Sequence, residues 1–302
     1  METRSTEARA MTLNERLTAY EKLMRLDRPI GILLLLWPAL WGLWFVAGAV
    51  PDYRILLIFV VGTIVMRSAG CIMNDLADRK FDPHVARTRE RALAAGLVSP
   101  KEAIALACVL FIVALFLVIK LNRLTIILAV IAVAMTVIYP FLKRFFPFPQ
   151  AWLGLAFGMS IPMAYAVYMN FVPIAGWFMM VANMFWAIAY DTEYAMVDRD
   201  DDIRLGLKSS AILLGRYDVA GIMLSHALFL FMMVVVGTWY RLGLFYYLGI
   251  GVALTQAAWQ FHLIRGRDRD QCFRAFLNNN WVGMAIFAGL ALDLFLRPGV
   301  AS

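Results

Sequence analysis

Charged residues are scarce in this sequence. Asp, Glu, Lys and Arg make up 16% of its 302 residues, whereas hydrophobic residues make up 62%. Soluble domains usually have about a quarter of their residues charged and about half apolar. The composition therefore argues against a soluble globular protein. The apolar residues occur in runs long enough to cross a bilayer, so we predict a polytopic membrane protein in contact with lipid.

Cysteine is also rare, and no secretion signal is evident. Cys71, Cys108 and Cys272 are scattered and form no CxxC pair, so neither a disulfide framework nor a zinc site is indicated. The first long apolar run begins near Ile30, after an arm of mixed charge, which is not typical of a cleavable signal peptide. We expect residues 1–29 to form a cytoplasmic arm and residues 30–302 to form a single transmembrane domain.

Nine apolar segments have the length of a transmembrane helix. They predict an all-α integral membrane protein with nine transmembrane helices. Their approximate ranges are 30–49, 54–73, 103–119, 124–141, 151–169, 173–190, 219–239, 243–262 and 281–296.

The basic residues are distributed unevenly between the two faces that these spans create. With the N-terminus in the cytoplasm, the inner segments hold 22 of the 28 Lys and Arg residues and the outer segments hold 5, while Arg67 lies within the second span. Inner loops of membrane proteins are enriched in these residues. The net charge of +7 thus follows from membrane orientation, and we expect no nucleic-acid partner. Two inner loops, about 74–102 and 191–218, are long, and functional residues tend to collect in such loops.

The first long inner loop opens with a row of acidic and amide residues. Asn74, Asp78 and Asp82 follow one another at intervals of four residues. Their side chains would lie on one face if the second predicted helix continued beyond the membrane. Like charges in such a row repel each other unless a cation lies between them. Oxygen donors of this kind suit a hard cation such as Mg²⁺, so we predict that all three residues bind metal.

The second long inner loop carries a matching row. Asp191, Asp198 and Asp202 are spaced to share one helical face. A single cluster would be explained as a solvated helix end. Two such rows at the inner ends of two spans favour a site at which Mg²⁺ bridges carboxylates to a diphosphate. The bases that could contact its phosphates, or could simply lie at the membrane surface, are Lys80, Arg87, Arg89, Arg91, Lys143, Arg199 and Lys208.

Two further arginines lie near these rows. Pro140 is expected to kink or end the fourth span. Arg144 would then project at the inner surface, either as an interfacial anchor or as a bidentate partner of a carboxylate. Arg67 lies about two turns inside the second span and seven residues before Asn74, and therefore on roughly the same face. A charged side chain at that depth needs a partner, which favours a role in the site.

The sequence resembles the UbiA superfamily of intramembrane prenyltransferases from about residue 20 to residue 290. The segments that carry the resemblance are 25–31, 74–82, 191–202 and 206–215, together with Tyr139 and Lys143. Segment 191–202 most resembles the branch of the family that acts on 4-hydroxybenzoate. Ala92 stands where the family commonly has proline, so we expect the first loop to be less rigid here.

The resemblance implies nine helices around a central cavity, capped on the cytoplasmic side by the two long loops, in the inner membrane of a bacterium. It implies Mg²⁺ as the cofactor, with a polyprenyl diphosphate and 4-hydroxybenzoate as substrates in ubiquinone biosynthesis. The prenyl group would join the ring ortho to the hydroxyl. Asp191, Arg67 and Tyr139 would take part in catalysis, and Arg144 or Arg67 would bind the acceptor carboxylate. The implied metal ligands are Asn74, Asp78, Asp82, Asp198 and Asp202, and the implied diphosphate ligands are Lys80, Arg87, Lys143, Arg199 and Lys208.

Two other functions are compatible with parts of the pattern. An enzyme of the same superfamily with another aromatic acceptor, such as homogentisate or a naphthoate, would carry the same motifs. A secondary transporter would place its acids near the bilayer midplane between broken helices. In this sequence the acids cluster in loops at one face. Mg²⁺-dependent release of pyrophosphate is the observation that separates the enzyme from the transporter.

Overall fold

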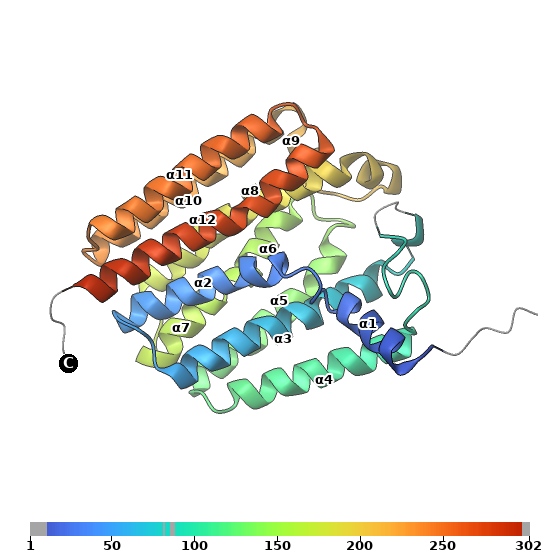
Figure 1. The fold of residues 1–302 in the computed structure, drawn as a ribbon, viewed down its shortest axis with the longest axis horizontal. Coiled ribbons are helices and arrows are strands. Elements are labelled where there is room, and N and C mark those ends of the chain that lie inside the picture. The colour runs from blue at the N-terminus through green and yellow to red at the C-terminus, as the bar shows by residue number, and fades with distance from the viewer. Residues whose placement is uncertain (1–10, 81, 85–87, 298–302) are drawn as a thin grey trace, which may run out of the picture.

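Every regular element in the described part of the chain is helical. The structure is a computed structural model, and it describes residues 11–80, 82–84 and 88–297. These residues form α-helices and two short 3₁₀ turns but no β-strand, as the apolar runs predict (Figure 1). The α-helices are α1 (Leu13–Leu23), α2 (Ile30–Ala47), α3 (Tyr53–Asp78), α4 (Pro100–Val118), α5 (Arg123–Leu142), α6 (Pro149–Gly158), α7 (Ser160–Met169), α8 (Ile174–Leu205), α9 (Ser210–Leu214), α10 (Asp218–Trp239), α11 (Leu244–Ile264) and α12 (Arg269–Leu296), and the 3₁₀ turns are η1 (Asp82–His84) and η2 (Gly215–Tyr217).

Seven stretches of the described chain are long and apolar enough to cross a membrane, judged by length and composition. They are α2, α3, α4, α5, α6 together with α7, Ser210–Trp239, and α12. The remaining two predicted spans correspond to α8 and α11, which fall outside this set. Polar residues such as Asn183 in α8 and Gln256 and Gln260 in α11 lower their mean hydropathy. The chain is therefore an all-α, multi-pass membrane protein.

Local sequence signals set several helix ends. Thr12 and Ser99 begin capping boxes at the starts of α1 and α4, which satisfy backbone amides that the helix itself leaves unpaired. α8 ends because Gly206 takes the left-handed conformation at φ 67°, which glycine adopts without strain. α6 and α7 form one stretch interrupted at Met159, since Pro162 has no N–H to donate to the carbonyl four residues earlier.

The bundle has a densely packed side and a loosely packed side. α2, α7, α8, α10, α11 and α12 enclose the main core, where the rings of Trp41, Trp186 and Phe229 lie against one another with centroids 5.2–5.8 Å apart. α11 and α12 approach closely at Gly249, where any side chain would collide with the backbone of Ala285. By contrast, only 11% of the apolar stretch of α4 and 17% of that of α5 is buried inside the protein. These two helices therefore present most of their surface to lipid.

α1 and the two long loops lie at the same end of the bundle (Figure 1). α1 buries Ala19 and Leu23 in a small second core shared with α3 and α4. Ala92 is 2% exposed in this core, and its carbonyl accepts hydrogen bonds from the amides of Leu97 and Val98. Packing and backbone hydrogen bonds thus order the first loop at the position where the family commonly has proline.

Candidate active site

A cavity of about 830 Å³ extends from the loop end of the bundle between its helices. The α3 residues that line the cavity recur every three or four positions, so they belong to one face of the helix along most of its length. Its inner end is polar and its outer half is mostly apolar. The α3 residues in the wall are Ile58, Phe59, Gly62, Thr63, Met66, Arg67, Gly70, Cys71, Asn74, Asp75 and Asp78.

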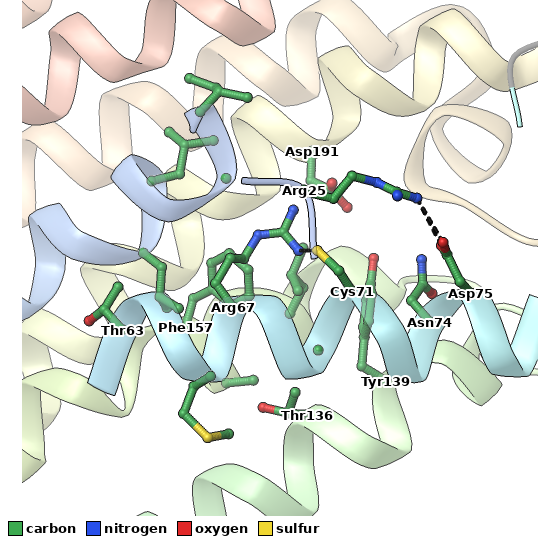
Figure 2. Close-up of a pocket in the computed structure, with 18 of the residues that line it drawn as sticks. Arg25, Thr63, Arg67, Cys71, Asn74, Asp75, Thr136, Tyr139, Phe157 and Asp191 are labelled. Atoms are coloured by element: carbon green, nitrogen blue, oxygen red, sulfur yellow. Dashed lines mark hydrogen bonds and ion pairs between the residues drawn. The ribbon is translucent and has the colours of Figure 1, made fainter. Parts of the chain in front are cut away.

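α8 contributes a matching row from the other side of the cavity. The row contains Tyr190, Asp191, Tyr194, Ala195, Asp198, Asp201, Asp202 and Leu205. Asn74, Asp78 and Asp82 line the same cavity from α3 and the turn after it. Figure 2 shows Asn74 and Asp75 pointing from α3 into the space that Asp191 borders. The fold therefore brings the two acidic rows of the sequence to one cavity.

The prediction of a single helical row for Asn74, Asp78 and Asp82 is wrong for Asp82. α3 ends at Asp78, and Asp82 begins the 3₁₀ turn η1. Asp82 still lines the cavity, where it is buried and accepts hydrogen bonds of 3.1 and 3.2 Å from Nη1 of Arg91. Burial raises the pKa of Asp82, and the neighbouring Arg91 guanidinium opposes this rise.

Asp75 is a residue of this site that the sequence reasoning missed. It is 1% exposed, and Nη2 of Arg25 donates to its two carboxylate oxygens at 2.9 and 3.0 Å (Figure 2). Nη1 of Arg91 donates to Asp75 Oδ1 at 3.2 Å. Arg25 lies between α1 and α2, so this ion pair brings the N-terminal arm into the cavity wall. Asp75 follows Asn74 directly in the sequence, but the search for residues four positions apart selected Asp78 and omitted Asp75.

Two of the predicted phosphate-binding lysines line the cavity. Nζ of Lys143 donates to Oδ2 of Asp78 at 2.5 Å. α5 runs through Pro140 and ends at Leu142, so the proline does not itself end the helix. The Lys208 amide donates to the Lys143 carbonyl at 2.8 Å, which holds the second loop against the end of α5.

Two other predicted phosphate ligands are not part of the cavity wall. Lys80 is exposed and does not line the cavity. Arg199 follows Asp198 by one residue, which turns it to another face of α8, and its Nη1 donates to Oδ2 of Asp218 at 3.0 Å. These positions do not support the predicted diphosphate contacts of Lys80 and Arg199. The remaining predicted ligand, Arg87, lies outside the described residues.

Arg144, the first predicted ligand of the acceptor carboxylate, also lies outside the cavity wall. It is exposed, its Nη2 donates to the Ala77 carbonyl at 2.8 Å, and its guanidinium lies over the ring of Phe141 at 5.3 Å from the centroid. Arg144 thus joins the end of α5 to the end of α3. This position corrects the expectation that Arg144 reaches the acceptor, because helix periodicity no longer controls side-chain direction beyond the end of α5.

Arg67, the second predicted ligand of that carboxylate, lies in the cavity wall. Its guanidinium packs against Gly31 of α2, where a Cβ atom would collide with it, and Cys71 lies beside it (Figure 2). Asp191 of α8 and Tyr139 of α5 line the same cavity, and Asp191 lies close enough to the Arg67 guanidinium for their charges to interact. Arg67 Nε is buried without a hydrogen-bond partner in the described part of the chain. Since an unpaired buried donor is destabilising, a ligand oxygen would satisfy it.

The inner end of the cavity offers oxygen donors that fit Mg²⁺. Asn74, Asp78, Asp198 and Asp202 line it, and Asn74 Oδ1 is buried without a hydrogen-bond partner among the described residues. The described part of the chain contains no group of three or more His, Cys, Asp or Glu side chains that could by themselves hold a metal ion. A cation between the two rows would therefore need oxygens from a ligand as well. Mg²⁺ usually binds in this manner, through a few carboxylates together with substrate phosphates.

Comparisons with known proteins identify the family to which this chain is similar. The family profile described as the UbiA prenyltransferase family matches residues 35–286. The 4-hydroxybenzoate octaprenyltransferase of Nitrosospira multiformis is 58% identical over 287 residues, which cover 95% of this chain and 99% of that protein. The enzyme of the same name from Thiobacillus denitrificans is 54% identical over 289 residues, which cover 96% of this chain and 99% of that protein.

Solved structures share the fold. The apo structure of a UbiA homologue from Aeropyrum pernix K1 matches with a TM-score of 0.76 and 24% identity, over 87% of this chain and 97% of that one. A UbiA homologue from Archaeoglobus fulgidus bound to GPP and Mg²⁺ matches with a TM-score of 0.68 and 17% identity, over 92% of this chain and all of that one. The family profile covers most of the chain, and relatives more than half identical to it cover nearly all of it. The chain therefore belongs to the UbiA prenyltransferase family.

Proposed function

We propose that this protein transfers a polyprenyl group from a polyprenyl diphosphate to 4-hydroxybenzoate. The group would join the carbon ortho to the hydroxyl, with release of pyrophosphate, as a step in ubiquinone biosynthesis. The observation that carries the proposal is a single cavity with two acidic rows at its inner end and apolar walls beyond them. Relatives that are 51–58% identical over most of the chain bear the name 4-hydroxybenzoate octaprenyltransferase, which supports the choice of both substrates.

In this proposal the two acidic rows would hold Mg²⁺ beside the diphosphate. The Mg²⁺ ligands would be Asn74 and Asp78 on α3 and Asp198 and Asp202 on α8, with Asp82 close to the first pair. When bound, Mg²⁺ neutralises the charge that develops on the departing pyrophosphate. The oxygen-only donor set and the buried, unpartnered Asn74 Oδ1 support this assignment.

Basic side chains at the inner end would hold the phosphate oxygens. Lys143 and Lys208 line the cavity there, and so do Arg25 and Arg91, which both pair with Asp75, while Arg91 also pairs with Asp82. Guanidinium groups bind phosphate and carboxylate with the same two-pronged geometry. A diphosphate can thus share these arginines with the carboxylate. Arg87 of the same loop remains part of the proposal, although it lies outside the described residues.

The acceptor would lie deeper in the cavity, beside Arg67. We assign its carboxylate to Arg67, because the guanidinium lies in the cavity wall and its Nε has no partner in the described chain. Asp191 would accept a hydrogen bond from the phenol and so increase electron density on the adjacent ring carbon. Tyr139, which lines the same cavity, would orient Asp191 by donating a hydrogen bond from its hydroxyl. The apolar walls would keep water from the electron-deficient allylic carbon.

The membrane arrangement that we propose has nine spans, with α8 and α11 added to the seven that qualify by length and composition. The N-terminus and both acidic loops would face the cytoplasm, and the host membrane would be the bacterial inner membrane. Residues 30–302 would form one transmembrane domain. The sequence predicted loops at about 74–102 and 191–218, but α3 continues to Asp78 and α8 to Leu205, so the cap would consist of these helix ends and the segments that follow them. The excess of Lys and Arg in the segments on that side supports this orientation.

The test is an assay of the purified full-length protein in detergent. It receives octaprenyl diphosphate with equal amounts of 4-hydroxybenzoate, homogentisate and a dihydroxynaphthoate, with Mg²⁺ or with EDTA. We expect pyrophosphate release only with Mg²⁺, and mass spectrometry should find prenylated 4-hydroxybenzoate as the main product. A different prenylated acid would assign the protein to another branch of the family. No pyrophosphate release with any acceptor would reject the enzymatic function in favour of transport.

A further inference from the structure

The outer half of the cavity wall contains a glycine that protein packing does not explain. Gly62 belongs to the cavity-lining row of α3, and a Cβ atom at this position would meet no atom within 4 Å. Its backbone is not in the left-handed region, so the turn of the chain does not require glycine. Glycine weakens a helix interior relative to alanine. The position therefore lowers helix stability and leaves open space beside α3.

Other helical glycines of this protein have a packing reason. A Cβ atom at Gly154 would lie 2.7 Å from the Met184 Cα, and one at Gly249 would lie 2.5 Å from the Ala285 carbonyl oxygen. Gly251 also has open space around it, but it is exposed on α11 and does not line the cavity. Gly62 differs from all of these because its open space belongs to the cavity.

The wall around Gly62 is apolar. Ile58, Phe59 and Met66 flank it on α3, and α4 and α5 supply further aliphatic and aromatic side chains on their cavity-lining faces. Those from α4 and α5 include Phe111, Leu115, Val118, Val130 and Val133. A donor whose diphosphate lies at Asn74 and Asp78 would place its hydrocarbon tail against these residues, since the inner end is polar.

The position of Gly62 on α3 sets its distance from Asn74, where the diphosphate would lie. Gly62 precedes Asn74 by twelve residues, which is about 18 Å at a helical rise of about 1.5 Å per residue. An extended isoprene unit spans about 5 Å, because it contains four chain bonds of about 1.5 Å at ordinary bond angles. A tail of two units, about 10 Å long, ends before Gly62. A tail of eight units must pass Gly62 if it follows the cavity.

We propose that Gly62 determines donor specificity by keeping the channel open for tails longer than about three isoprene units. The inference rests on the proposed prenyltransfer, since it concerns the tail of the same donor. A side chain at position 62 projects into the channel without meeting the protein. It therefore blocks long tails and leaves the reaction centre, which lies nearer the loop end, unchanged.

The experiment compares Gly62→Ala, Gly62→Leu and Gly62→Phe with the wild type. Each full-length protein in lipid nanodiscs receives 4-hydroxybenzoate, Mg²⁺ and equal amounts of geranyl and octaprenyl diphosphate, and mass spectrometry measures the ratio of the two products. We expect the octaprenyl-to-geranyl ratio to fall at least about tenfold in Gly62→Phe, because inserting a large side chain into a filled site is strongly unfavourable. The fall should be smaller in Gly62→Leu and slight in Gly62→Ala. The ratio does not depend on how much of each protein is folded.

Gly251→Phe is the matched control, because it adds the same side chain to a helix position with open space outside the cavity. Its product ratio should equal that of the wild type. An unchanged ratio in Gly62→Leu and Gly62→Phe would overturn the proposal, because the tail would then leave the cavity before reaching position 62. An equal loss of both products in these variants would overturn it as well. A wild-type protein that makes neither product would instead reject the proposed function.

Discussion

Asp75 and Asp218 are almost completely buried aspartates, and each binds two arginines. The partners of Asp75 are Arg25 and Arg91, and those of Asp218 are Arg199 and Arg267. The two clusters are alike in the burial of the central aspartate and in contact distance, but the arginines of the second are more exposed and Arg91 of the first also pairs with Asp82. They differ in position, because the first lines the cavity whereas the second joins the end of α8 to α10 and to the loop before α12.

This difference in position separates two uses of the same chemistry. At Asp75 the arginines border a space large enough for a ligand, so a diphosphate can compete with the carboxylate for them. The pocket beside Arg199 and Arg267 is smaller, about 290 Å³, and we expect these arginines mainly to fix three segments relative to one another. Substitutions in the first cluster should therefore change catalysis, and substitutions in the second should change stability.

The largest effect on turnover is expected for the acidic residues at the inner end of the cavity. Asp78→Ala should lower turnover by about 10²- to 10³-fold, because it removes a proposed ligand of the Mg²⁺ that would stabilise developing charge. The matched control is Asp200→Ala, since the Asp200 side chain is 67% exposed, does not line the cavity and pairs with Arg269. That variant should keep near wild-type turnover. Near-normal activity of Asp78→Ala at limiting Mg²⁺ would remove this residue from the metal site.

The second effect is on stability. Asp218→Ala leaves the charges of Arg199 and Arg267 without their buried partner, although both side chains are partly exposed and can turn toward water. We expect a loss of about 2–3 kcal/mol in the free energy of unfolding, somewhat less than the roughly 3–5 kcal/mol for breaking a fully buried pair. Denaturation in detergent measures this loss, and turnover per folded molecule should stay within about twofold of the wild type. A large fall in turnover with unchanged stability would contradict the contrast between the clusters.

The third prediction concerns the two arginines considered for the acceptor carboxylate. Arg67→Ala should raise the KM for 4-hydroxybenzoate by at least about tenfold, because losing a buried charged pair costs roughly 2–5 kcal/mol. It should also abolish the preference for the acid over its methyl ester. Arg144→Ala is the control, because Arg144 lies outside the cavity wall. An acceptor defect in Arg144→Ala alone would reverse the assignment.

The smallest effect is expected at Arg25. Arg25→Ala should raise the KM for the prenyl diphosphate about three- to fivefold, since Arg91 remains to bind both Asp75 and phosphate. The corresponding change in the other cluster, Arg267→Ala, should lower the melting temperature without changing either KM. Equal KM values in Arg25→Ala and wild type would place Arg25 among the purely structural arginines.

Helical periodicity accounts for most of what the sequence could reveal. The lengths of the apolar segments predicted the all-α fold, and helical periodicity placed Arg67 and Asn74 on one face of the second span, where the structure has both in the cavity wall. Arg144 was harder to place, because α5 ends at Leu142 and a residue beyond a helix end has no periodic direction. The helical position predicted for Asp82 was wrong for the same reason, because α3 ends at Asp78.

The pairing of acids with bases could not be predicted from the sequence. Asp75 binds an arginine from fifty residues earlier, and Arg199 binds an aspartate nineteen residues later. Both choices depend on which helices are neighbours in the bundle. Distinguishing the two arginine clusters therefore required the structure, although every residue in them was visible as a charge.

The sparse packing of α4 and α5 affects how the cavity is kept dry. In a soluble enzyme, protein side chains alone separate a reacting group from bulk water. Here α4 and α5 bury little of their surface in the protein, although both contribute to the cavity wall. Acyl chains of the surrounding lipids therefore form the outer layer of that enclosure. We therefore expect the thickness and chain order of the host bilayer to influence the reaction rate of this polypeptide.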